Sequence, residues 1–138
     1  MSRVKATKKE IELLARLMRA EALGEGNTGM LLVANTGINR VVAGCGEFKK
    51  ITTVQKMVFQ SPGGFEGAHA PLFNTTPRTS QLNFAKKAIK FWRGHPATDA
   101  LWFRTPIDGA CQEFYGKFRG RYKNHCFYDP ENKRKCNL

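Results

Sequence analysis

Two glutamates in the segment LMRAEALGEG, residues 17–26, are the first candidates for acid–base chemistry in this chain. Glu21 follows Leu17 by four residues and Met18 by three, so on a helix it lies at the edge of their apolar face. A carboxyl group against apolar neighbours either finds a polar partner or keeps its proton, because desolvation raises its pKa. A carboxylic acid that is still protonated near neutral pH can serve as a general acid.

The second glutamate, Glu25, lies beyond Gly24, where we expect the helix to end. Glu21 would then be the last side chain at the buried edge of the helix. Glu25 would be exposed in the turn or would anchor the start of a second helix. The alternative for both carboxylates is structural, with each one bound by a nearby arginine or a backbone amide.

Helices must position these residues, because helical signals fill the first part of the chain. The segment TKKE, residues 7–10, matches a capping box, and apolar residues then recur at helical spacing, which predicts a helix over about 8–23. A second periodic face closes at Gly44. Short and longer helices are expected within 52–60 and 80–94, respectively.

Between these last two helices, residues 61–79 are dense in Gly, Pro and Thr, so we expect an irregular, flexible flap that contributes little core. Residues 100–105 and 124–129 are short and rich in aromatic side chains, as strands are. Helices followed by a small extended part predict an α+β fold, and a chain of 138 residues suits one domain, 1–138.

The chain is strongly basic, with 23 Lys and Arg against 11 Asp and Glu and a formal net charge of +12. This excess predicts attraction to a polyanion without identifying it, and nucleic acid, an acidic membrane surface and anionic wall polymer all fit. Basic and aromatic residues alternate in 117–125, as in some nucleic-acid binders, although a solvated basic face is the simpler interpretation. No segment has the roughly 20 apolar residues of a membrane span, and the N-terminus lacks a signal-peptide core.

Four cysteines and three histidines give no recognisable metal site. Cys45, Cys111, Cys126 and Cys136 include no C-x-x-C pair, and His69, His95 and His125 are scattered. One or two disulfides and reduced, buried thiols remain alternatives, and the pairing cannot be deduced. The adjacent pair of His125 and Cys126 does not form a catalytic dyad by itself, because neighbouring residues in a strand point to opposite faces.

Several longer segments resemble a known family. ARLMRAEALGEG, GMLLVANTGINRV, FQSPGGFEG, LWFRTP and NHCFYDP are similar to the spore cortex-lytic cell wall hydrolases of the SleB/CwlJ type, most closely to the CwlJ branch. The resemblance extends from about Val4 to Asp129. It implies a peptidoglycan-cleaving domain related to lysozyme and lytic transglycosylase folds, which acts on spore cortex during germination without a required metal or organic cofactor.

The resemblance also assigns site residues. The first glutamate of A-E-A-x-G-E, Glu21 here, is the catalytic acid of the family. A Q-P-x-x-F segment corresponds to Gln60 and Phe65, except that Ser61 stands between the glutamine and the proline. We expect substrate to contact Gln60, Phe65, Trp102, Glu25 and His125. Phe103 is a further candidate wall of the cleft, whereas Tyr128 is mainly structural.

Two other functions remain as alternatives. An N-acetylmuramoyl-L-alanine amidase would cut the stem peptide from the sugar, but such enzymes typically need zinc. A non-catalytic basic protein could bind wall polymer or nucleic acid, and nucleic acid is the less favoured of the two. The family resemblance further implies a spore-coat protein partner and a location in the coat or at its boundary with the cortex. A chain without a signal peptide suits that location.

Overall fold

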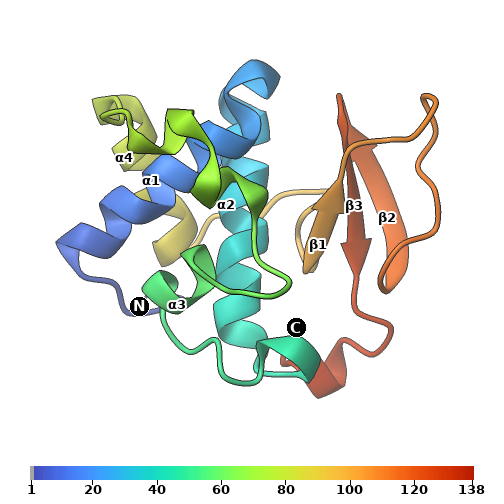
Figure 1. The fold of residues 1–138 in the computed structure, drawn as a ribbon. Coiled ribbons are helices and arrows are strands. Elements are labelled where there is room, and N and C mark those ends of the chain that lie inside the picture. Colours follow the sequence, from blue (N-terminus) through green and yellow to red (C-terminus); the bar gives the residue numbers. More distant parts are fainter. Residues whose placement is uncertain (1) are drawn as a thin grey trace.

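The helices lie on one side of the molecule and a small antiparallel sheet lies on the other (Figure 1). The computed structural model describes residues 2–138. The main elements in chain order are α1 (Lys8–Ala22), α2 (Gly26–Ala43), α3 (Val54–Val58), α4 (Thr79–Lys90), β1 (Trp102–Arg104), β2 (Lys117–Tyr122) and β3 (His125–Asp129). This order of helices and strands confirms the predicted α+β fold.

The start of α1 is set by the predicted capping box. The Thr7 hydroxyl accepts a hydrogen bond from the Glu10 amide, and the Glu10 carboxylate accepts one from the Thr7 amide. The helix ends at Ala22, and one tight 3₁₀ turn, Leu23–Glu25, connects it to α2. Glu21 therefore belongs to the last turn of α1, as expected.

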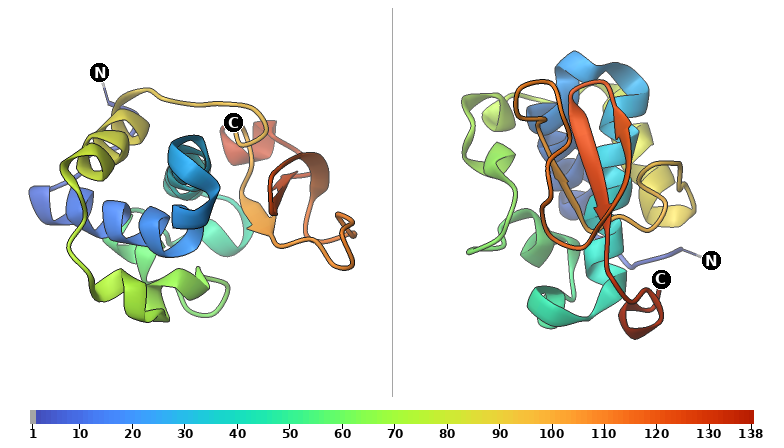
Figure 2. Two further views of the ribbon diagram at one scale, coloured as in Figure 1. Left: turned by 90° about the horizontal axis from the view of Figure 1, so that it is seen from above. Right: turned by 90° about the vertical axis from the view of Figure 1, so that its right-hand side faces the viewer.

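Helix α2 lies between the other helices and the sheet (Figure 2). One of its sides packs Val33, Ala34 and Ile38 into the large helical core. Its other side places Leu32 against Phe127 of β3 in a second, smaller core. A helix that is covered on both sides buries residues nearly all round, which explains why its polar residues Asn35, Thr36, Asn39 and Arg40 are buried along with its apolar ones.

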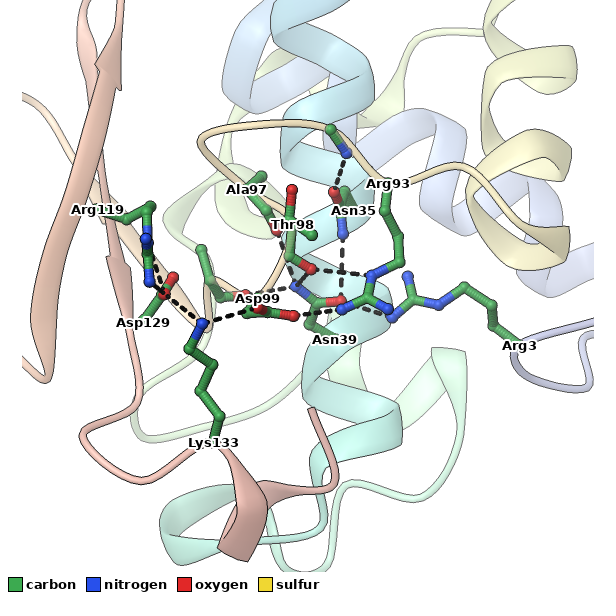
Figure 3. Close-up of polar contacts among 12 residues, drawn as sticks. Arg3, Asn35, Asn39, Arg93, Ala97, Thr98, Asp99, Arg119, Asp129 and Lys133 are labelled. Carbon is green, nitrogen blue, oxygen red and sulfur yellow. Dashed lines mark hydrogen bonds and ion pairs between the residues drawn. The ribbon is translucent and has the colours of Figure 1, made fainter.

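Asn39 of α2 holds the segment that crosses from the helices to the sheet (Figure 3). Its buried Nδ2 donates to the carbonyl oxygens of Ala97 at 3.0 Å, Thr98 at 3.2 Å and Ala100 at 2.8 Å. Its Oδ1 accepts from Arg3 Nη2 at 2.7 Å. Because buried carbonyl groups need donors, this one amide fixes the irregular backbone that leads into β1.

The sheet has the order β1-β3-β2, with antiparallel pairing throughout. All five residues of the central strand β3 are buried. The edge strand β2 is not predicted from the sequence, which indicates only a basic surface patch in this region. In the structure, most residues of β2 are exposed. An exposed edge strand lacks the apolar alternation on which strand prediction depends.

The segment 61–79 is more ordered than we expected. It contains two 3₁₀ turns, Glu66–His69 and Pro71–Asn74. Phe65 and Phe73 are buried in the helical core, and Arg16 Nη1 donates to the carbonyl oxygens of Phe73 at 3.1 Å and Thr75 at 3.0 Å. The expectation of a flap with little core is therefore wrong, since two aromatic side chains anchor the segment in the helical core.

All four cysteines are paired. One disulfide, Cys45–Cys136, joins the end of α2 to the C-terminal segment, and the other, Cys111–Cys126, joins the β1–β2 loop to β3. Of the two alternatives for the cysteines, the structure has the disulfide-bonded one. Lys133 Nζ also binds Asp99 Oδ2 at 3.1 Å (Figure 3). This contact joins the C-terminal segment to residues 97–100, which lead from the helices to the sheet.

We expect Cys45–Cys136 to stabilise the fold more than Cys111–Cys126 does. The first pair closes a loop of 91 residues and the second a loop of 15. Chain entropy alone gives contributions of about 4–5 and about 3 kcal/mol, respectively. Urea unfolding of the Cys45→Ala/Cys136→Ala and Cys111→Ala/Cys126→Ala variants measures both. Alkylation of any cysteine in the native, unreduced protein would contradict the pairing.

Candidate active site

An open groove of about 470 Å³ separates the helical side from the sheet. Its walls come from the end of α1, from α2, from residues 63–66 and from β1 with the loop that follows it. The lining residues are Glu21, Arg40, Glu47, Gly63, Gly64, Phe65, Glu66, Trp102, Phe103, Arg104, Thr105, Phe114, Tyr115 and His125. Carboxyl groups, two guanidinium groups and aromatic rings thus share one cavity.

Glu21 reaches the groove from the last turn of α1. Its Oε1 accepts a hydrogen bond from the Gly67 amide at 2.6 Å. Burial raises the pKa of Glu21 above the ordinary glutamate value, and the Glu66 carboxylate raises it further, whereas the Gly67 hydrogen bond and Arg40 lower it. Because the net shift is upward, Glu21 keeps its proton to a higher pH than a free glutamate does.

Gly67 allows the backbone to approach Glu21 this closely. A Cβ atom at this position would lie 2.8 Å from both Cγ and Oε1 of Glu21. At contacts below 3.0 Å one of the groups must move, so a side chain at this position would displace the flexible Glu21 carboxyl group. The FEG part of the sequence motif therefore supplies the partner of the glutamate on α1.

Arg40 of α2 forms the floor of the groove and is only 4% exposed. Its Nε donates to the Leu101 carbonyl at 2.7 Å and its Nη1 to the Gly63 carbonyl at 3.2 Å. The guanidinium carbon lies 4.0 Å from the Phe65 ring centre and 4.9 Å from that of Phe48. Burial lowers the pKa of Arg40 to about 10, so the side chain remains a cation at neutral pH.

Sequence reasoning did not identify Arg40 as a site residue. Its position on the buried face of a predicted helix, within the I-N-R end of a quoted motif, was the available signal. A charged side chain on such a face is buried only when it has partners. Apolar periodicity alone cannot show those partners, because both carbonyl groups come from distant segments.

Trp102 and Phe65 contribute aromatic walls, as expected. The Trp102 indole Nε1 donates to Glu47 Oε1 at 3.1 Å, which fixes the orientation of the ring. Phe65 stacks on Phe103 with 5.4 Å between ring centres. Phe65 is buried, so Trp102 presents the larger accessible aromatic surface in this part of the groove.

His125 also lines the groove, from the start of β3. Its ring centre lies 4.8 Å from that of Phe103, and the side chain is buried. Burial lowers the pKa of His125, although the charge of Glu25 opposes the shift. The imidazole is therefore mainly neutral near pH 7, and its buried Nδ1 has no hydrogen-bond partner among the described residues.

Two predicted site residues do not line the groove. Glu25 is buried, and its carboxylate accepts from the Asn124 amide at 3.0 Å while its carbonyl accepts from Lys123 Nζ at 3.1 Å. Both alternatives for Glu25 are therefore wrong: it is not exposed, and its side chain does not cap the start of α2 but binds the β2–β3 turn instead. Gln60 lies behind Gly63, so its amide is not part of the groove wall.

We expect a Gly67→Ala substitution to raise the pKa of Glu21 further. The methyl group displaces the carboxyl group from the Gly67 amide, and that hydrogen bond lowers the pKa in the wild type. A carbon-13 NMR titration of the glutamate carboxyl groups measures the change. Gly24→Ala is the matched control, because no atom lies within 4 Å of the added Cβ. An unchanged Glu21 titration in Gly67→Ala would contradict the assigned contact.

The sequence of this chain matches a known protein family. Residues 24–128 match the model of a family described as Cell Wall Hydrolase. The match begins after Glu21, so it does not by itself concern that residue.

Full-length relatives extend the similarity to nearly the whole chain. The cell wall hydrolase CwlJ of Oceanobacillus iheyensis is 53% identical over 94% of this chain and 93% of its own length. Its namesake in Bacillus subtilis is 42% identical over 94% and 92%. The crystal structure of the catalytic domain of Bacillus cereus SleB has the same fold, with a TM-score of 0.72 at 24% identity over 92% of this chain and 96% of that one. The chain therefore belongs to the cell wall hydrolase family.

Proposed function

We propose that this protein cleaves the glycan strands of spore cortex peptidoglycan during germination, with Glu21 as the catalytic acid. The observation that carries the proposal is one carboxyl group with a raised pKa in an aromatic-lined groove. Cleavage of a glycosidic bond needs a proton donor for the leaving oxygen, and a glutamate whose pKa is raised by burial suits that role. The names of the relatives, which are cell wall hydrolases, support the same class of substrate.

The proposed subclass is a lytic transglycosylase or a muramidase that uses this single acid. Two further carboxylates, Glu47 and Glu66, line the groove. Glu47 already accepts the Trp102 indole hydrogen bond, and Glu66 is exposed at the rim. Glu21 combines partial burial with an upward pKa shift, which favours a mechanism in which it acts first as the acid and then as the base. Anhydro-sugar ends among the products identify transglycosylation, and reducing ends identify hydrolysis.

The amidase alternative depends on a zinc site. Within residues 2–138, no group of three or more His, Cys, Asp or Glu side chains is arranged to hold a metal ion. The four cysteines are also unavailable as thiolate ligands, because they form disulfides. These observations favour glycan cleavage over zinc-dependent removal of the stem peptide.

The alternative of a basic nucleic-acid binder is weakened by how the fold uses its cations. Arg119 Nη2 pairs with Asp129 at 2.7 Å, and Arg121 Nη1 donates to the Gly109 carbonyl at 2.7 Å. Lys123 holds the Glu25 carbonyl. Three of the four Lys and Arg residues within 117–125 therefore make contacts inside the protein. The net charge of +12 still attracts anionic wall polymer.

The proposed setting is the spore coat or its boundary with the cortex, with a coat protein as a partner. In the described part of the chain, the helices are too short or too polar to cross a bilayer. Fractionation of spores with an antibody against this chain tests the location.

We expect Glu21→Gln to reduce cortex lysis by about 10²–10⁴-fold, because the amide keeps the shape of the side chain and removes the transferable proton. Release of muropeptides from purified cortex measures the loss. Glu25→Gln is the matched control, since that carboxylate binds a backbone amide outside the groove and its variant should retain lysis. Near-normal lysis by a folded Glu21→Gln protein would overturn the assignment.

The same variant has an expected stability signature. The pKa of Glu21 is higher in the folded protein than in the unfolded chain, so its ionisation opposes folding. Below about pH 4.3 the protonated Glu21 side chain makes its full contribution to the stability of the wild type. This contribution is lost as the pH rises through the folded-state pKa. Because glutamine does not ionise, Glu21→Gln should melt at an equal or higher temperature than the wild type at pH 7. A clear loss of stability would indicate a structural carboxylate instead.

Exhaustive chelation should leave cortex lysis essentially unchanged, because the proposed chemistry uses proton transfer by a carboxyl group. Turbidity loss of cortex suspensions with and without EDTA measures this. Inhibition that added zinc reverses would favour the amidase alternative.

A further inference from the structure

The loop between β1 and β2 and the start of β2 expose an unusual number of large apolar side chains. Four of the seven most exposed large hydrophobic residues of the described chain lie within residues 107–118: Ile107, Phe114, Tyr115 and Phe118. Tyr115 is 59% exposed and Phe114 is 38% exposed. Contiguous exposed apolar patches of this kind often mark binding surfaces.

The fold holds this loop in place, although the loop contributes little core. The disulfide Cys111–Cys126 joins it to β3, and the Tyr128 hydroxyl donates to the Gln112 carbonyl at 2.5 Å. Arg121 Nη1 donates to the Gly109 carbonyl at 2.7 Å. Three attachments to β2 and β3 within a short loop fix the exposed rings, so little ordering entropy is lost when they bind a ligand.

The groove that contains Glu21 continues onto this loop across β1. Side chains alternate along a strand, so Trp102 and Arg104 lie on the face of β1 opposite to Phe103. Phe103 packs into the helical core, whereas Trp102 lies beside Phe48 and Glu47. Phe114 and Tyr115 also lie on that side, because Phe114 packs against Tyr128, the β3 partner of Trp102. Trp102, Arg104, Phe114 and Tyr115 all line the groove.

These side chains form a connected surface with one unpaired cation. Ring centres lie 4.8 Å apart between Phe114 and Tyr115 and 5.7 Å apart between Tyr115 and Trp102. The Arg104 guanidinium lies 4.6 Å from the Phe114 ring centre. The salt bridges among residues 2–138 do not include Arg104. Its charge is therefore directed at the groove without a protein counter-ion.

We propose that Trp102, Phe114, Tyr115 and Arg104 form a glycan-strand subsite separate from the point of cleavage, with a sugar ring on the aromatic rings and a stem-peptide carboxylate on Arg104. The proposal rests on the proposed function and adds the substrate feature that is recognised: a polymer that carries peptides. Aromatic faces suit the apolar faces of sugar rings, and an arginine fork suits a carboxylate. Because these residues and Glu21 line the same groove, a glycan strand held at the subsite can extend along the groove to Glu21.

Binding measured in a Glu21→Gln background tests the subsite without lysis. The probe is insoluble peptidoglycan purified from spore cortex, and the readout is the fraction of protein that sediments with it. Tyr115→Ala should weaken binding about tenfold with an unchanged melting temperature, because the ring is mostly exposed. Phe118→Ala is the matched control: it removes a ring of similar exposure that does not line the groove, and binding should stay within about twofold.

Arg104→Gln, measured in the same background, tests the carboxylate. It should weaken binding to the peptide-bearing cortex about fivefold to tenfold and leave binding to glycan strands stripped of peptides unchanged. Equal binding by Tyr115→Ala and its parent, or an equal loss in Phe118→Ala, overturns the subsite. An equal loss on stripped glycan overturns the role of the carboxylate. Failure of the proposed function appears separately, as lysis by Glu21→Gln.

Discussion

The buried guanidinium group of Arg40 holds the two walls of the groove together. One of its nitrogens binds the Leu101 carbonyl, at the entrance to β1, and another binds the Gly63 carbonyl, in the segment that leads to Gly67. Phe65 and Phe48 cover its two sides. A buried cation without partners would cost several kcal/mol, so the sheet and the 61–79 segment must close on Arg40 in this one arrangement. The distance between Glu21 and the aromatic walls follows from it.

The electrostatic state of Glu21 follows from the same arrangement. Arg40 lowers the pKa of Glu21 and would keep the carboxyl group ionised if its charge dominated. Burial has the larger effect, and the exposed Glu66 carboxylate adds to it. Arg40 also interacts electrostatically with Glu47 and donates hydrogen bonds to two carbonyl groups. It therefore supports the groove without cancelling the upward pKa shift of Glu21. The raised pKa of Glu21 is thus mainly a consequence of desolvation.

Local signals in the sequence were enough to predict α1 and the position of Glu21. The capping box of Thr7 and Glu10 and the apolar spacing after it require only neighbouring residues. Neither alternative for Glu25, exposure or a cap of the second helix, is right, because its partner, the Asn124 amide, lies 99 residues away. The order in 61–79 escaped prediction for a similar reason: a Gly- and Pro-rich composition describes the backbone, whereas Phe73 is fixed by packing on α1.

The helical and sheet halves of the molecule are stabilised in different ways, and the groove lies where they meet. The helical half buries one large apolar cluster, whereas the sheet half has only two small clusters, around Phe127 and around Phe48 and Leu101. Small cores provide little hydrophobic free energy, and both disulfides lie in or next to this half. Burial of apolar side chains therefore stabilises the helical half, whereas the disulfides stabilise the sheet half. They keep its aromatic loop fixed beside the groove without covering the rings that a substrate would contact.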